Sequence, residues 1–199
     1  MKVRVPTVTV ASVILLCAAG SYARAGGFAE GVVGIASPIS DSTYNDEYDA
    51  SPKLGVRIGS WLRDQDHVLL GFELAADITF LDGPDLPILT DESYNRIRAL
   101  GGVRIAYDAT NTVRVTGRMD VGVDYTRASS MLVNTSNTAS DLGLAVDPSV
   151  ALQIHLGAGS YGVEVGVPIG THSGKDSDAF VNYNSYDFDF LFVASVDID

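Results

Sequence analysis

The sequence predicts an all-β fold: an eight-stranded antiparallel up-and-down barrel whose strands cross a membrane. Three observations predict this fold. Eight segments alternate apolar and polar side chains, short and long connections follow one another in strict order, and the polar faces carry charges of both signs. In the clearest segment, 112–127, Met119 and Tyr125 fall on one face and Arg118 and Asp120 on the other. Because successive strand side chains point to opposite sides, this segment is predicted to be one strand with an apolar and a charged face.

The same alternation defines the elements in chain order. Strands are predicted at 28–37, 53–62, 67–80, 96–107, 112–127, 142–156, 161–169 and 187–198. Short connections are predicted at 63–66, 108–111 and 157–160. Long polar connections are predicted at 38–52, 81–95, 128–141 and 170–186. Strict alternation of the two classes is typical of a barrel with short periplasmic turns at one end and long external loops at the other. Ten shorter strands remain an alternative.

Aromatic residues on the apolar faces fall near the two ends of the predicted strands. The predicted girdle residues are Phe80, Tyr107, Tyr125, Tyr161, Phe188 and Phe190. Amphipathic rings collect at both membrane interfaces, so two aromatic bands are expected of a barrel that spans a bilayer. Pro148 and Pro168 are predicted to lie near the outer rim, where the loss of a ladder hydrogen bond is tolerable.

The opposite faces of the strands carry the ionisable residues. The predicted lumen charge network consists of Glu30, Arg57, Glu73, Asp77, Arg98, Arg104, Arg114, Arg118, Asp120, Asp124 and Glu164, and Asp147 and His155 share this face. An outward Arg would cost about 2–4 kcal/mol at the bilayer midplane, so these residues are expected inside the barrel. Eight strands enclose only enough space for their own side chains. We therefore expect a lumen plugged by ion pairs.

The short turns allow the hairpin registers to be predicted. The tightest closures place Arg104 opposite Arg114 and Arg98 opposite Asp120. Similar closures place Arg57 opposite Glu73 and Gln153 opposite Glu164. The adjacent arginines would repel one another unless carboxylates from other strands lie between them.

The N-terminal 25 residues read as a signal peptide, so the barrel domain is predicted to span 26–199. Lys2 and Arg4 precede a short apolar run, and 23–25 reads Ala-Arg-Ala, a small-x-small cleavage site. Cleavage would remove Cys17, the only cysteine, and with it any thiol chemistry. The formal net charge of −12 argues against nucleic acid as a partner.

Over 26–199 the pattern resembles the small eight-stranded outer-membrane barrels of Gram-negative bacteria, of the OmpA transmembrane-domain and OmpX/Ail type. This resemblance implies export through the periplasm to the outer membrane and contact with outer-membrane lipid and lipopolysaccharide. Barrels of this type act as envelope-stabilising proteins, adhesins or complement-resistance factors, and a few are lipid-modifying enzymes. We expect a monomer with a structural, envelope or adhesin-like surface role and no enzymatic activity. The chain departs from such barrels by ending on 196–199, Val-Asp-Ile-Asp, without a terminal aromatic residue.

Three other functions remain open at this point, one of them a small pore, which conductance steps in planar bilayers would reveal. A soluble periplasmic lipocalin-like ligand binder would have the reverse orientation, apolar inside and polar outside, which alternation alone does not distinguish. A lipid A-modifying barrel enzyme would use His172 and Ser173, although adjacent strand positions point apart. Acid–base catalysis by Asp120 and Asp124 is disfavoured because a plugged lumen leaves no place for substrate. No catalytic, cofactor-binding or metal-binding residue is predicted.

The four long connections form the predicted contact surface. They contain many Asp, Glu, Tyr and Asn residues, against the single base Lys175. Tyr and Asn make adaptable interfaces, and carboxylates can bridge to lipopolysaccharide phosphates through divalent cations. The simplest interpretation is a solvated rim.

Overall fold

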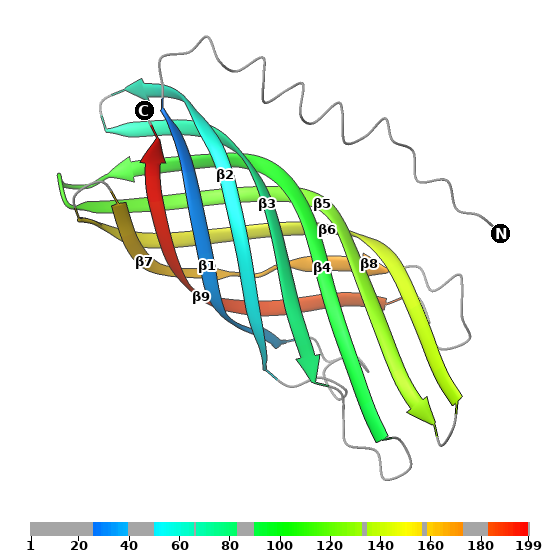
Figure 1. Ribbon diagram of the computed structural model, residues 1–199. Coiled ribbons are helices and arrows are strands. Elements are labelled where there is room, and N and C mark those ends of the chain that lie inside the picture. The colour runs from blue at the N-terminus through cyan, green and yellow to red at the C-terminus, as the bar shows by residue number, and fades with distance from the viewer. Residues whose placement is uncertain are drawn as a thin grey trace.

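The strands form one antiparallel sheet that closes on itself, as Figure 1 shows. The computed structural model describes residues 26–39, 50–65, 67–82, 90–132, 135–156, 159–172 and 183–198. The strands are β1 (Gly27–Pro38), β2 (Ser51–Gln65), β3 (Val68–Asp82), β4 (Thr90–Asp108), β5 (Val113–Leu132), β6 (Thr135–Leu156), β7 (Gly159–Gly166), β8 (Ile169–His172) and β9 (Tyr183–Ile198). Each strand from β1 to β7 pairs with the next, with β9 following β7, and β1 pairs with β9 to close the barrel. The predicted signal peptide lies outside the described residues.

β7 and β8 occupy a single strand position in the wall. Both pair with β6 on one side and with β9 on the other, in a common register. The barrel therefore has eight strand positions, as predicted. Val167 and Pro168 interrupt the predicted strand 161–169 because proline has no N–H to return to the ladder.

The position of the prolines differs from the prediction. Val167 N donates to the carbonyl oxygen of Pro148 at 3.1 Å, and Asp187 N donates to that of Pro168 at 3.1 Å. Pro148 also pairs with Met119, near the middle of β5. The prolines therefore lie at mid-height in the wall and not at the outer rim, because β5 and β6 continue beyond the predicted strand ends.

The long connections are shorter than the alternation predicts. The predicted loop 128–141 is mostly strand, since β5 continues to Leu132 and β6 begins at Thr135. β4 likewise begins at Thr90, inside the predicted loop 81–95. These segments contain many Ser and Thr residues, whose hydroxyl groups can form hydrogen bonds across strands without producing an apolar face. No helix in the described ranges could span a membrane.

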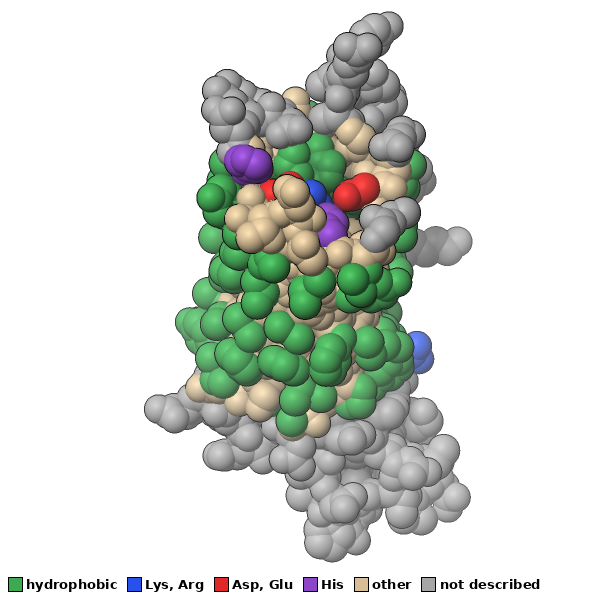
Figure 2. All heavy atoms as spheres, turned by 90° about the vertical axis from the view of Figure 1, so that its left-hand side faces the viewer, with side chains coloured by type: hydrophobic (Ala, Val, Ile, Leu, Met, Phe, Trp, Pro, Cys, Tyr) green, Lys and Arg blue, Asp and Glu red, His purple; other side chains and the backbone are tan. Residues whose placement is uncertain are grey.

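The orientation of the strands answers the question that alternation left open. Val121 is 57% exposed and Val115 is 38% exposed, whereas Arg118 is 7% exposed and Asp120 is fully buried. Figure 2 shows the apolar side chains as a broad band around the visible exterior. The wall is thus apolar outside and charged inside, which is the reverse of a lipocalin-like ligand binder.

The predicted hairpin registers are wrong. Arg104 pairs with Arg118, and Arg98 pairs with Asp124. The turn explains this shift, because Thr110 Oγ1 accepts hydrogen bonds from the amides of Thr112 and Val113 and so moves the hairpin centre along the chain.

The other two predicted pairings fail in the same way. Arg57 lies opposite Ala75 in a hairpin with an irregularity between Trp61 and Arg63. Gln65 pairs with Val68, so the hairpin closes farther along the chain than predicted, and the β-bulge offsets only one residue of this shift. In the β6–β7 hairpin, Gln153 lies opposite Gly162 and Glu164 lies opposite Ala151.

Candidate functional site

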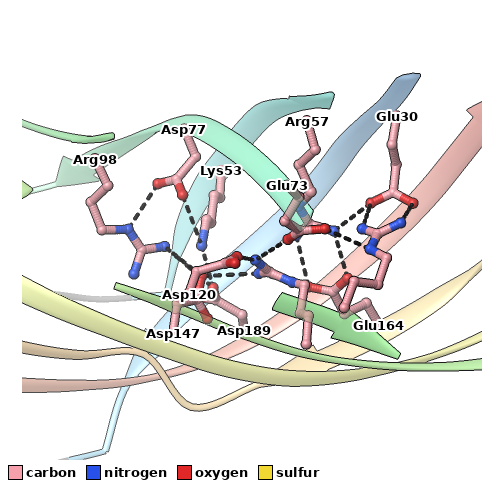
Figure 3. Close-up of polar contacts among 12 residues, drawn as sticks. Glu30, Lys53, Arg57, Glu73, Asp77, Arg98, Asp120, Asp147, Glu164 and Asp189 are labelled. Carbon is pink, nitrogen blue, oxygen red and sulfur yellow. Dashed lines mark hydrogen bonds and ion pairs between the residues drawn. The ribbon is translucent and has the colours of Figure 1, made fainter. Parts of the chain in front are cut away.

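The barrel interior brings together charged residues from eight strands, β1 to β7 and β9. The structure buries Glu30, Arg57, Glu73, Asp77, Arg98, Arg104, Arg114, Arg118, Asp120, Asp124 and Glu164 on the inward face. Figure 3 labels Glu30, Lys53, Arg57, Glu73, Asp77, Arg98, Asp120, Asp147, Glu164 and Asp189 of the central part. Together with Arg104 and Arg118, which form ion pairs with them, we call these residues the lumen network. Alternation on each strand sends these side chains inward, because the outward face meets an apolar surrounding.

The half of the network nearer the short turns is built on Glu30 and Arg57. Arg57 Nη1 donates to Glu30 Oε1 at 2.6 Å, and both Arg57 terminal nitrogens donate to Glu164, at 2.6 and 2.8 Å. Arg104 donates to both oxygens of Glu30, at 2.8 and 3.1 Å. Its Nε lies 2.5 Å from Glu73 Oε2. Each cation therefore joins carboxylates from two different strands.

Arg118 is the centre of the network. Its guanidinium nitrogens lie 3.3 Å from Glu73, 3.1 Å from Glu164 and 3.0 Å from Asp147, and it also bonds to Asp120. Glu73 contacts both Arg118 and its paired neighbour Arg104. A carboxylate from another strand thus separates two adjacent arginines, as electrostatics requires.

The half of the network farther from the short turns contains residues that alternation could have identified but the sequence analysis missed. Lys53 bonds to Asp189 and lies 3.7 Å from Asp77. Arg98 Nε donates to Asp77 at 2.9 Å, and Arg98 Nη2 lies 3.6 Å from Asp189. Outside the network, Arg96 pairs with Asp187. The missed residues, Lys53, Arg96, Asp187 and Asp189, all keep the inward alternation of residues that were predicted.

The ion pairs cross the interior from wall to wall. Arg57 on β2 reaches Glu164 on β7, and Arg98 on β4 lies 3.6 Å from Asp189 on β9, on the opposite side of the barrel. The network therefore occupies the lumen along with the side chains that hold it. Among the described residues, no group of three or more His, Cys, Asp or Glu side chains is arranged to hold a metal ion.

An aromatic pair closes the lumen at the end with the short turns. The rings of Phe28 and Trp61 are 5.0 Å apart, centre to centre. The Arg104 guanidinium carbon lies 4.3 Å from the Phe28 ring centre, and that of Arg114 lies 5.6 Å from the Trp61 ring centre. These cation–π contacts join the charged residues of the lumen to the Phe28–Trp61 pair, which we call the seal.

The turns around this seal form a small open cavity of about 290 Å³. It is lined by His67, Asp108, Thr110, Asn111, Arg114 and His155. Arg114 Nε donates to Asp108 Oδ1 at 2.7 Å, and His155 Nε2 lies 3.8 Å from the same oxygen. Charged and histidine side chains are visible at this end in Figure 2. Asp108 is the carboxylate that lines this cavity, and it is already bound by Arg114. His155 also lines the cavity and therefore lies outside the lumen network.

Replacing Gly59 with valine is expected to destabilise the seal. A Cβ at Gly59 would lie 2.3 Å from Phe28 Cζ and 2.3 Å from the Phe72 carbonyl oxygen. Overpacking of this kind lowers the free energy of unfolding by about 1–3 kcal/mol. Urea unfolding in phosphatidylcholine vesicles, followed by the fluorescence of Trp61, measures the change; Trp61 is the chain's only tryptophan.

The matched control is Gly31→Val, because a Cβ at Gly31 meets nothing within 4 Å. This variant is expected to stay within about 0.5 kcal/mol of the parent protein. Equal unfolding of the two variants would show that Phe28 does not fill the space beside Gly59.

The exterior carries the predicted aromatic residues. Phe80, Tyr107, Tyr125, Tyr161, Phe188 and Phe190 are between 37% and 56% exposed. Tyr107 and Tyr161 lie beside the short turns, and the others lie toward the opposite end of their strands. Placement at both ends of an apolar band is the arrangement expected at two membrane interfaces.

Comparison with known proteins finds similarity at the level of fold. No family model matches the chain, and no curated protein matches it. Among solved structures, Ail, the attachment invasion locus protein of Yersinia pestis, is 11% identical with a TM-score of 0.53, covering 87% of this chain and 99% of that one. Neisserial surface protein A is 13% identical with a TM-score of 0.52, covering 86% and 96% of the two chains.

A third solved structure extends the comparison to another organism. A major outer membrane protein from Thermus thermophilus is 11% identical with a TM-score of 0.56, covering 87% of this chain and 99% of that one. The chain therefore has the closed eight-stranded fold of outer-membrane barrels. Its apolar exterior and charged interior are those of a barrel that crosses a membrane.

Proposed function

We propose that this protein is a non-enzymatic outer-membrane barrel that serves the cell envelope structurally or through contacts made at the cell surface. One observation supports the proposal most: ion pairs cross the lumen from wall to wall, so the interior acts as a structural plug. The surfaces left for interaction are then the lipid-facing wall and the ends of the strands.

The burial of the acidic side chains argues against catalysis in the lumen. Asp120 is fully buried and bonds to Arg118, and Asp124 is 1% exposed. A general acid or base must come within hydrogen-bond reach of its substrate, which these positions do not allow. For the enzyme alternative, His172 ends β8 and Ser173 lies outside the described residues. Replacing both residues and assaying lipid A species tests that alternative.

A surface role has support from two of the similar structures. One is an attachment invasion locus protein and another a surface protein, by their names. Of the connections predicted as a contact surface, residues 40–49, 83–89, 133–134 and 173–182 lie outside the described residues. Contact of these connections with lipopolysaccharide or with a surface partner therefore stays part of the proposal.

Expression of the full chain in a Gram-negative host tests the proposed function. We expect the protein in the outer-membrane fraction, with faster gel migration in detergent before heating than after, because a closed barrel resists unfolding. Proteolysis of intact cells should cut within the long connections and leave the strands whole. Recovery in the soluble periplasm would refute the proposal, and conductance steps in planar bilayers would refute the plugged lumen.

A further inference from the structure

Arg127 differs from every other basic side chain that the structure describes. The others are buried in the lumen: Lys53, Arg57, Arg96, Arg98, Arg104, Arg114 and Arg118. Arg127 is exposed. On β5 it shares the outward face with Tyr125, whereas Thr126 between them is buried. One cation therefore lies on the wall that faces lipid.

The height of Arg127 places it at the edge of the apolar band. On β5, the outward apolar positions run from Val113 to Tyr125. Twelve steps of about 3.3 Å along a strand tilted by about 40° correspond to a height of roughly 30 Å, which matches the hydrocarbon thickness of a bilayer. Arg127 is the next outward position, on the side away from the short turns. It therefore lies at the level of the lipid headgroups of the outer leaflet.

The neighbours of Arg127 in the wall are polar. Arg127 pairs with Asn95 on β4 and with Ser140 on β6, and both of these also face outward. The adjacent outward row, toward the membrane centre, consists of Ile97, Tyr125 and Leu142. Arg127 thus has an amide on one side, a hydroxyl on the other and apolar side chains below. Among the described carboxylates, none forms an ion pair with it.

We propose that Arg127, together with Asn95 and Ser140, binds the phosphate group of an outer-leaflet lipid headgroup. A guanidinium donates two parallel hydrogen bonds to a phosphate, and the flanking amide and hydroxyl supply further donors. The apolar row below holds the acyl chains of the same lipid. This inference rests on the proposed outer-membrane role and specifies one lipid contact of the wall.

Binding of a phosphate lipid by the intact folded barrel tests the site. The barrel is folded in maltoside micelles and titrated with dimyristoyl phosphatidic acid, while NMR follows the Nε–H signal of Arg127. We expect Arg127→Gln to weaken binding about five-fold, equivalent to the roughly 1 kcal/mol that one basic side chain contributes at an anionic surface. Arg127→Lys should retain part of the affinity, because it keeps the charge and loses the paired donors. For the variants, a signal from Ser140 replaces that of Arg127.

Two further titrations identify the source of the phosphate. Dimyristoyl phosphatidylcholine should bind more weakly than phosphatidic acid, and inorganic phosphate should not bind at millimolar concentration. The proposal is overturned if Arg127→Gln binds phosphatidic acid as well as the parent, or if inorganic phosphate binds equally well. Heat-modifiable gel migration of each variant shows that the barrel is folded, so a failure of this site is distinct from a failure of the proposed function.

Discussion

Arg118→Met is expected to lower the free energy of unfolding by about 3–5 kcal/mol, the usual cost of removing one partner from a buried ion pair. Arg118 contacts carboxylates of Glu73, Asp120, Asp147 and Glu164, and its side chain is 2% exposed. Methionine fills much of the volume but leaves these carboxylates without their shared cation. The lumen network already has more carboxylates than cations, so the remaining cations do not compensate for the loss. Urea unfolding in phosphatidylcholine vesicles measures the change.

Arg114→Met on the same strand is the matched control. Arg114 pairs with Asp108 and Asp197, whose side chains are 28% and 43% exposed. An ion pair whose carboxylates contact water contributes only about 0–1 kcal/mol to the free energy of unfolding, so this variant should lose little stability. A loss for Arg118→Met within about 1 kcal/mol of that for Arg114→Met would show that the lumen network does not hold the barrel together. Failure of Arg118→Met to refold at all would agree with the expected direction.

Val121→Arg has the second largest expected effect and tests the orientation of the wall. Val121 is 57% exposed and lies near the middle of the apolar stretch of β5. An arginine at the bilayer midplane costs about 2–4 kcal/mol, because its charge leaves water for hydrocarbon. Refolding into phosphatidylcholine vesicles across a urea series measures the loss.

Leu156→Arg provides the control for depth in the membrane. Leu156 is 62% exposed and ends β6 beside a short turn, so the same substitution there should cost about 0–1 kcal/mol. Equal losses at the two positions would mean that the exterior does not face hydrocarbon. In that case the membrane assignment would be wrong.

The fold was predictable because alternation has a strict period of two. Charged residues on the inward face of 112–127 can be satisfied only inside a barrel, and the structure buries Arg118 and Asp120 there. The same rule applied to residues 53 and 189 would have identified Lys53 and Asp189. Their omission from the predicted network was therefore avoidable, since both alternate with outward residues of clearly apolar character.

The contacts within the network were less predictable, because they depend on register. The Thr110 turn and the bulge near Trp61 each shift a hairpin, and a shift replaces every pair along it. Cross-lumen partners such as Arg57 and Glu164 depend on several registers together. The continuation of β5 and β6 through 128–140 was also missed, because backbone pairing there does not require an apolar face.

The pairing of β1 with β9 has a consequence for biogenesis. Gly27 lies opposite Ile198, and Pro38 lies opposite Asp187, so the two outermost segments of the domain meet along their length. Contacts between residues so distant in sequence form slowly. Until they form, two unpaired edges expose N–H and C=O groups that can recruit other chains. An unfolded chain is therefore expected to associate with other chains unless both edges are shielded until β1 and β9 pair.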